Sequence, residues 1–369
     1  MTLGILKEAS GENRVSALPE TVQKFKELGL DVLVEQGAGE NAFASDTDFI
    51  EAGAEIEDRA SVIQNAKIIL SIHPTIEDLK DKIIFGTYFP INDFAMAKKV
   101  AANNNTLFSM DNIPRTTRAQ SMDVLSSQAN IAGYKAVLIA AANYSRYFPM
   151  FMTAAGSIRP AKMLILGAGV AGLQAIATAR RLGAVVEVFD TRPAVKEEVK
   201  SLGAKFVEVE GAADASAAGG YAVEQSEEYK QKQTTLVAEH AAKSDIIITT
   251  AQIPGRKAPL LITEETLSKM KAGSVVIDLA ASTGGNCART ENEKTIDYKG
   301  VSIIGNSNIA STMPSDASKL YGKNILNFLN LFFDADNNFT INFEDDLIKG
   351  TCISKDGKII NERILKAMQ

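Results

Sequence analysis

Three glycines at G-x-G-x-x-G spacing form the part of the chain that most strongly indicates chemistry. Gly167, Gly169 and Gly172 follow the apolar run 163–166 and open a helical segment, and Asp190 ends the next strand-like run. The glycine spacing is weak alone, but a strand before it, a helix after it and an acid beyond it make it specific. Gly167 would allow a tight turn, Gly169 the close approach of a pyrophosphate, and Gly172 close helix packing. Because the helix N-terminus would attract the anion, we predict a dinucleotide site.

Asp190 indicates which dinucleotide this site selects. It lies 18 residues after Gly172, near the spacing at which a carboxylate accepts hydrogen bonds from the adenosine ribose hydroxyls. A carboxylate there repels a 2′-phosphate, so we predict NAD rather than NADP. Arg192 could soften this selection by pairing with a phosphate, although we expect a solvated arginine at the start of a helix. The predicted cofactor-binding residues are Gly167, Gly169, Val170, Ala171, Gly172, Asp190, Thr191, Arg192, Thr250, Ala251, Leu279 and Ala280.

Short apolar runs of strand type alternate with helical patterns along the chain. Segment 19–29, for example, carries Val22, Phe25 and Leu28 at helical spacing and stops at Gly29. Such alternation favours mostly parallel sheets with helices on both faces. We therefore predict an α/β protein with two Rossmann-like, doubly wound domains. The predicted strands are 2–6, 31–35, 67–72, 83–88 and 106–110 in the first domain, and 163–166, 185–190, 205–209, 245–249, 274–279 and 301–304 in the second.

Two further helical patterns set the predicted domain boundaries. The Ala-rich segment 130–148 has no strand character, and we interpret it as a helix that passes from the first domain to the second. Segment 315–333 is expected to carry the chain back. Its apolar residues close to one helical face are Leu320, Ile325, Leu329 and Phe332. The prediction is an N-terminal domain of residues 1–129 completed by 316–369, and a dinucleotide-binding domain of residues 130–315.

The composition argues against several classes of function. Across 369 residues, 39 Lys and Arg stand against 45 Asp and Glu, a net charge of −6, whereas nucleic-acid binding needs a clustered positive surface. Cys287 and Cys352 are the two cysteines, too few for a disulfide framework or a Cys-rich zinc site, so we predict no metal and a reducing compartment. The N-terminus lacks the pattern of a secretory signal, and the longest apolar stretch is far shorter than a membrane span. These features favour a cytoplasmic protein.

Three segments resemble one protein family: 114–134 (PRTTRAQSMDVLSSQANIAGY), 154–192 around the glycine motif, and 275–287 (VVIDLAASTGGNC). Together they look like the NAD(H)-binding component, domain I of the alpha subunit, of the proton-translocating NAD(P) transhydrogenases, which are related to alanine dehydrogenases. The rest of the chain follows the layout of that component from end to end. A dinucleotide-binding fold alone would not predict the first segment, so the resemblance is specific.

The resemblance implies which residues hold the reacting end of the nucleotide. In the family, a loop corresponding to Arg115, Gln120 and Asp123, with Ser126 just after it, holds the nicotinamide ring and its ribose. Arg115 and Asp123 would form a pair that repositions as the nucleotide moves. An amide and charged side chains are suited to fixing the carboxamide and to selecting which face of the ring is presented.

Segment 211–230 is Ala/Gly-rich and long for a connection between a strand and a helix. A connection of this length is either a functional lid or a flexible insertion. The family has a mobile loop here that closes over NAD(H), with a tyrosine after paired glycines. By this resemblance Tyr221, which follows Gly219 and Gly220, would be the closing residue.

The resemblance also implies how the reaction proceeds. Direct hydride transfer between two nicotinamides needs no proton acceptor, whereas a dehydrogenase that oxidises an alcohol or amine needs one. Alanine dehydrogenases place a lysine, a histidine and an aspartate where this chain has Ile72, Phe89 and the region of Ser282-Thr283. We therefore expect the chain to bind NADH and pass hydride to NADP⁺ on a separate NADP(H)-binding domain or subunit. The family further implies a homodimer that is attached peripherally to a membrane through a proton-channel subunit.

Two other functions stay open at this stage: an amino-acid dehydrogenase of the alanine type, and a non-catalytic NAD-binding regulatory subunit. His73, at a predicted strand end, could act as an acid or base, although a hydrogen-bonded structural histidine is more common. Arg14 corresponds to the substrate-carboxylate arginine of the dehydrogenases, but we expect it to stabilise the first domain. His240 is expected on the surface of a helix.

Overall fold

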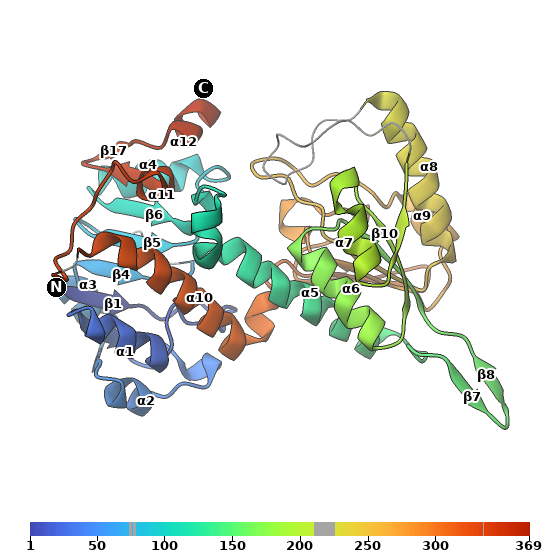
Figure 1. The fold of residues 1–369 in the computed structure, drawn as a ribbon, viewed down its shortest axis with the longest axis horizontal. Helices are drawn as coiled ribbons and strands as arrows, with labels where there is room; N and C mark the ends of the chain where they lie inside the picture. Colours follow the sequence, from blue (N-terminus) through green and yellow to red (C-terminus); the bar gives the residue numbers. More distant parts are fainter. Residues whose placement is uncertain (74–75, 77–78, 210–225, 335) are drawn as a thin grey trace. The chain divides into compact units, whose positions relative to one another are not determined.

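The structure is a computed structural model that describes residues 1–73, 76, 79–209, 226–334 and 336–369. Two compact units divide the chain (Figure 1): unit 1 comprises Met1–Gln128 and Ala310–Gln369, and unit 2 comprises Ala129–Ile309. The sequence placed the second boundary at 315/316, and the chain leaves unit 2 at 309/310. Tyr221 lies outside the described residues.

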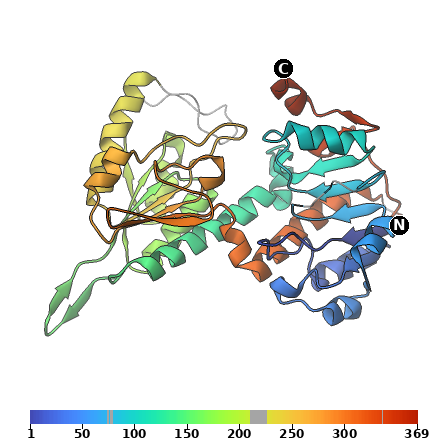
Figure 2. The same cartoon turned by 180° about the vertical axis from the view of Figure 1, so that it is seen from behind.

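Unit 1 is built on one eight-stranded sheet. Its strands are β1 (Thr2–Ile5), β2 (Asp31–Glu35), β3 (Glu55–Glu57), β4 (Ile68–Leu70), β5 (Ile83–Gly86), β6 (Thr106–Ser109), β16 (Cys352–Lys355) and β17 (Lys358–Ile359). The spatial order is β17-β16-β6-β5-β4-β1-β2-β3, and the six strands from β6 to β3 run parallel. The C-terminal strand β16 pairs antiparallel with β6 (Figure 2), which fastens the end of the chain to the sheet formed by its beginning.

Helices cover both faces of this sheet. One core includes residues from α1 (Pro19–Glu27), α2 (Asp46–Glu51), α10 (Pro314–Leu329) and α11 (Asp346–Thr351), and the other from α3 (Arg59–Asn65), α4 (Phe94–Ala102) and α12 (Glu362–Ala367). Side chains of a strand alternate between the two faces. Leu70 of β4 accordingly lies in the first core, and its neighbour Ile69 lies in the second.

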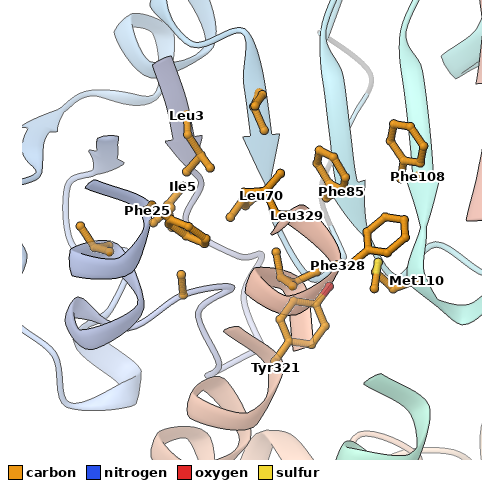
Figure 3. Packing of buried hydrophobic residues seen from close by; sticks show 14 of the residues in the cluster. Leu3, Ile5, Phe25, Leu70, Phe85, Phe108, Met110, Tyr321, Phe328 and Leu329 are labelled. Carbon is orange, nitrogen blue, oxygen red and sulfur yellow. The ribbon is translucent and has the colours of Figure 1, made fainter. Parts of the chain in front are cut away.

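Aromatic side chains fill the core beneath α10. The rings of Phe85 and Phe108, from adjacent strands, stack with their centroids 4.9 Å apart, and Phe328 of α10 meets Phe85 edge-on at 6.0 Å (Figure 3). Tyr321 is buried on the same helix. Leu320 was predicted for this face, but it is 37% exposed, because each residue turns a helix by about 100° away from the buried row.

Unit 2 is built on a seven-stranded sheet. Its strands are β9 (Lys162–Leu166), β10 (Val185–Phe189), β11 (Lys205–Val207), β12 (Ile246–Thr249), β13 (Val275–Asp278), β14 (Lys294–Tyr298) and β15 (Val301–Gly305). The order is β11-β10-β9-β12-β13-β15-β14, with only β14 antiparallel among these strands. The chain builds outward from β9 on one side and then returns to add β12 on the other. In such sheets ligands bind at the carboxyl ends of the strands where the order reverses.

The faces of this sheet are also covered by helices. Part of α5 (Val124–Asn143), α6 (Val170–Arg181) and α7 (Lys196–Ser201) pack on one face, with α8 (Glu227–Lys243) and α9 (Glu264–Lys269) on the other. Met163 and Ile165 of β9 belong to the first core, whereas Leu164 and Leu166 belong to the second. No helix within the described ranges combines the length and the apolar character that crossing a bilayer requires.

The predicted α/β class with mostly parallel sheets is confirmed. The sequence missed the edge strands β3, β14, β16 and β17, and a separate hairpin formed by β7 (Phe151–Thr153) and β8 (Gly156–Ile158). The helix predicted to begin at residue 130 begins instead at Val124 and ends at Asn143. Its early start is explained by Asp123, whose carboxylate accepts hydrogen bonds from the N–H and hydroxyl of Ser126 in the first turn.

Candidate dinucleotide-binding site

The glycine turn follows β9 at the point where the strand order reverses. Gly167 has a φ of +107°, in the left-handed region that glycine adopts without a steric penalty. A Cβ atom on Gly172 would lie 1.9 Å from the carbonyl oxygen of Gly167. The turn therefore needs glycine at both positions, and it sets the start of α6 directly against the end of β9.

The first turn of α6 fits an anionic group. Gly169 is the residue that precedes the helix, and it makes no side-chain hydrogen bond to the first-turn N–H groups. A Cβ atom on Gly169 would meet no atom of the described chain within 4 Å, so the space beside this backbone is open. Helix N-termini with unsatisfied N–H groups bind phosphate. The pyrophosphate of a dinucleotide fits this turn.

Asp190 follows β10 and is almost fully buried, with 6% of its side chain exposed. Its Oδ2 accepts a hydrogen bond from Ala168 N (2.7 Å), which connects the carboxylate to the glycine turn. Arg192 is not a solvated side chain, as the sequence suggested: its Nε and Nη2 donate to Oδ1 and Oδ2 of Asp190 at 2.9 and 2.7 Å. The guanidinium and carboxylate planes match in a two-point contact, which a sequence pattern does not reveal.

The other predicted cofactor residues follow the carboxyl ends of β12 and β13. Leu166 of β9 is in register with Thr249 of β12, and Thr249 with Asp278 of β13, so the segments after these strands emerge at the same edge of the sheet. Thr250 donates from Oγ1 to the carbonyl oxygens of Leu166 and Gly167, both at 3.3 Å. The structure thereby brings the segment after β12 against the glycine turn.

Asp278 and Asn286 hold these segments in place, and the sequence analysis missed both. The buried Asp278 carboxylate accepts from the N–H groups of Ala280 (2.9 Å) and Asn286 (2.7 Å). The Asn286 amide in turn accepts from Ala251 N at 3.0 Å and donates to Ala251 O at 2.9 Å. An acid that ends an apolar strand, as in VVID, was the available signal. These two side chains position Ala251 and Ala280 at the edge of the sheet.

The residues assigned to the nicotinamide end belong to unit 1 or to the first turn of α5. Arg115 and Gln120 are exposed, and Gln120 lies in the 3₁₀ helix Thr117–Met122. Asp123 and Ser126 are brought together, with the Ser126 hydroxyl donating to Asp123 Oδ2 at 2.6 Å. The pair between Arg115 and Asp123 stays a prediction.

A buried ion pair occupies Arg14. Both side chains of the pair Arg14 and Glu12 are 6% exposed, and Arg14 Nε and Nη2 donate to the two Glu12 oxygens at 2.8 and 2.6 Å. Arg14 Nη1 also donates to Gln128 Oε1 at 2.8 Å. Burial alone would raise the pKa of Glu12, but the bonds from Arg14 prevail and lower it to about 2. This geometry gives Arg14 a stabilising role in unit 1.

His73 lies beside this pair in a hydrogen-bonded position. Its Nδ1 donates to the carbonyl oxygen of Thr87 at 3.0 Å, and its Nε2 lies 3.5 Å from Arg14 Nη2. Burial and the positive charge of Arg14 lower the pKa of the ring, so His73 is neutral near pH 7. A neutral ring with Nδ1 committed to a carbonyl matches the structural alternative named above.

The positions that carry proton-handling residues in alanine dehydrogenases hold other groups. The Ile72 side chain is buried, and its N–H donates to Glu8 Oε1 at 2.5 Å. Burial raises the pKa of Glu8 to about 7 against these backbone hydrogen bonds. Ser282 donates its N–H to Ser307 Oγ, and Thr283 donates its hydroxyl to Ala280 O. Both serve the geometry of the loop after β13.

His240 is not a surface residue, as the helical pattern suggested. Its side chain is 18% exposed, and its Nδ1 lies 2.6 Å from Oε2 of Glu187 on β10. The pair joins α8 to the sheet, so His240 has a packing role in unit 2.

Comparisons with known proteins agree with this geometry. The family described as alanine dehydrogenase/PNT matches the chain with its N-terminal domain over residues 4–132 and its C-terminal domain over residues 136–362. The first of the separate polypeptides of the NAD(P) transhydrogenase alpha subunit in Rhodospirillum rubrum is 45% identical over 98% of each chain. The crystal structure of transhydrogenase from Sinorhizobium meliloti is 45% identical, with a TM-score of 0.89 over 98% of this chain and 100% of that one.

An L-alanine dehydrogenase structure is similar in fold, at 21% identity and a TM-score of 0.81 over 100% of this chain and 99% of that one. Family and relatives therefore agree over nearly the whole sequence. This chain belongs to the alanine dehydrogenase/PNT family and, within it, to the alpha subunits of the NAD(P) transhydrogenases.

Proposed function

We propose that this chain binds NADH at the glycine turn of unit 2 and passes hydride directly to NADP⁺ held by a partner NADP(H)-binding domain or subunit. The observation that carries the proposal is the open, uncapped first turn of α6 after Gly169. Family membership then supports the transhydrogenase reaction. Bound NADH supplies the hydride. The chain holds the pyrophosphate at α6 and the adenosine ribose near Asp190.

Direct transfer asks this chain to bind and orient, and not to move a proton. Among the residues that the structure describes, Ile72 is apolar, and Ser282 and Thr283 are committed to loop hydrogen bonds. His73 is kept neutral and donates to a carbonyl. The orienting role falls to Arg115, Gln120, Asp123 and Ser126, and beyond the described residues to Tyr221. These are the side chains that we propose hold the nicotinamide and its ribose.

We further propose that the chain acts on the cytoplasmic side of a membrane as a peripheral component. A membrane subunit that conducts protons would couple proton movement to hydride transfer. Relatives named as subunit alpha support the presence of other subunits.

We also propose that two copies of the chain associate through the β7–β8 hairpin. Met150 and Met152 are 61% and 78% exposed, and Phe151 is 41% exposed. A two-stranded hairpin with exposed apolar side chains is marginal alone in water, and exposed apolar patches mark interfaces. Replacing Met152 with lysine should shift the mass in sedimentation velocity from dimer to monomer. Leu260→Lys, at another exposed apolar residue of unit 2, should leave the dimer intact; a monomeric wild type would contradict the proposal.

The reaction is tested by mixing the purified chain with an isolated NADP-binding partner domain. We expect hydride to pass from NADH to bound NADP⁺ only when both proteins are present, and neither alanine nor pyruvate to be turned over with NAD(H). Alanine oxidation at ordinary dehydrogenase rates would favour the amino-acid dehydrogenase. Absence of transfer at every partner concentration would favour a regulatory NAD-binding subunit.

Asp123→Asn is the matched variant for this assay. Asparagine keeps an oxygen that can accept the Ser126 N–H bond, so the start of α5 and the unfolding temperature should change little. Transfer should nevertheless slow by about 10- to 100-fold if the carboxylate orients the nicotinamide end. Equal rates in variant and wild type would remove Asp123 from the proposed site.

A further inference from the structure

The Asp190 carboxylate has no hydrogen-bonding capacity left for a ribose. Its Oδ1 accepts from Arg192 N (2.8 Å) and Arg192 Nε (2.9 Å). Its Oδ2 accepts from Ala168 N (2.7 Å) and Arg192 Nη2 (2.7 Å). A carboxylate offers about four acceptor positions, and all of them are in use. A ribose hydroxyl can bind Asp190 only if one of these bonds is given up.

The guanidinium bonds are the ones that can be exchanged. The bonds from Ala168 N and Arg192 N come from backbone groups whose positions are set by the glycine turn and by the segment after β10. The guanidinium lies at the end of a long side chain that is 18% exposed, on the solvent side of a carboxylate that is 6% exposed. A two-hydroxyl ribose edge can replace its two donors, whereas nothing can replace the backbone donors without rebuilding the turn.

We propose that Arg192 is the specificity-determining residue of this site: its guanidinium closes Asp190, the ribose hydroxyls displace it, and without the Asp190 charge it binds a 2′-phosphate. The proposal rests on NAD(H) binding at this turn, as argued under the proposed function. It goes beyond repulsion by Asp190, because it gives the same turn a built-in cation for the phosphorylated nucleotide.

Charge explains why the wild type still selects the unphosphorylated form. A phosphate monoester carries about −1.5 to −2 charges near pH 7 and pairs with a guanidinium at two points. To reach Arg192 it must take the guanidinium from Asp190. That would leave an almost fully buried carboxylate beside the phosphate with its charge partner removed, a strongly unfavourable arrangement. The ribose diol carries no charge and replaces the lost donors directly.

The test compares Asp190→Asn with the double variant Asp190→Asn/Arg192→Gln in the full-length chain. NADH and NADPH are titrated by their fluorescence, and unfolding temperatures are measured in parallel. In Asp190→Asn we expect NADPH to bind roughly tenfold or more tighter than in wild type, and NADH to bind more weakly. In the double variant the gain for NADPH should disappear. Arg192→Gln alone should widen the preference for NADH over NADPH, and Asp190→Ser repeats the comparison if the asparagine variant folds poorly.

Two outcomes separate this proposal from the function on which it rests. If wild type binds NADH selectively but the single and double variants bind NADPH equally, the role of Arg192 is overturned and the proposed function stands. If wild type fails to bind NADH, the proposed function fails first and takes the role of Arg192 with it.

Discussion

Replacing Gly172 with alanine is expected to destabilise unit 2 and abolish NADH binding. The new methyl carbon would lie 1.9 Å from the carbonyl oxygen of Gly167 and 2.9 Å from its carbonyl carbon. Both are backbone atoms, so the clash is relieved only by moving α6 away from β9. Overpacking of this kind costs about 3 kcal/mol or more when backbone must shift. Thermal unfolding and NADH titration should therefore change together.

Gly169→Ala is the matched control, because it alters the same turn without a clash. Its Cβ would meet no atom of the described chain within 4 Å, and its φ of −78° suits any residue. Stability should stay near that of wild type, while the methyl group obstructs the pyrophosphate and weakens NADH binding. A Gly172→Ala protein with unchanged stability and affinity would contradict the close packing described for α6.

Replacing Arg14 with alanine is expected to be the most damaging change in unit 1. The variant leaves the Glu12 carboxylate, 6% exposed, without its ion-pair partner. Removing one partner of a buried pair costs about 3–5 kcal/mol, which corresponds to an unfolding temperature lower by roughly 10 °C. The double variant Arg14→Ala/Glu12→Gln should recover part of this loss, because it no longer buries a lone charge. A double variant less stable than the single one would contradict the assignment.

The loss in Arg14→Ala should also depend on pH. In wild type the pKa of Glu12 is about 2, below its value in the unfolded chain, so the pair stabilises the fold above about pH 4.5 and less as pH falls toward 2. Without Arg14, burial raises the pKa of this carboxyl, and protonation then relieves the variant. The difference in unfolding free energy between wild type and variant should therefore shrink as pH falls from 7 to 4.

The central strands were predictable because they are apolar runs between helical patterns. The run 163–166 and the glycines after it specify β9, the turn and the start of α6 within a few residues. The strands that were missed lie at sheet edges or outside the sheets, where one side is solvated and the apolar pattern is short. β14, with the sequence KTIDY, is exposed or half-buried throughout, so its pairing with β15 depends on tertiary contacts that composition does not reveal.

The site was predictable where residue type alone determines the role. Glycine at 167 and 172 follows from backbone geometry. Arg192 was misjudged because an arginine after a strand reads as solvated, whereas its side chain turns back onto Asp190 two residues earlier. Asp278 and Asn286 were missed because they hold loops together across distant parts of the sequence. The residues of the nicotinamide end came from family resemblance and not from any physical pattern.

Isotope transfer tests the central claim most directly. NADH carrying deuterium at the reactive carbon of the nicotinamide is incubated with this chain, NADP⁺ and the isolated NADP-binding partner domain in ordinary water. The account predicts that the deuterium appears in NADPH without exchange into solvent, because hydride passes directly from one ring to the other. Deuterium recovered in alanine after addition of pyruvate and ammonia, or lost to water, would contradict it.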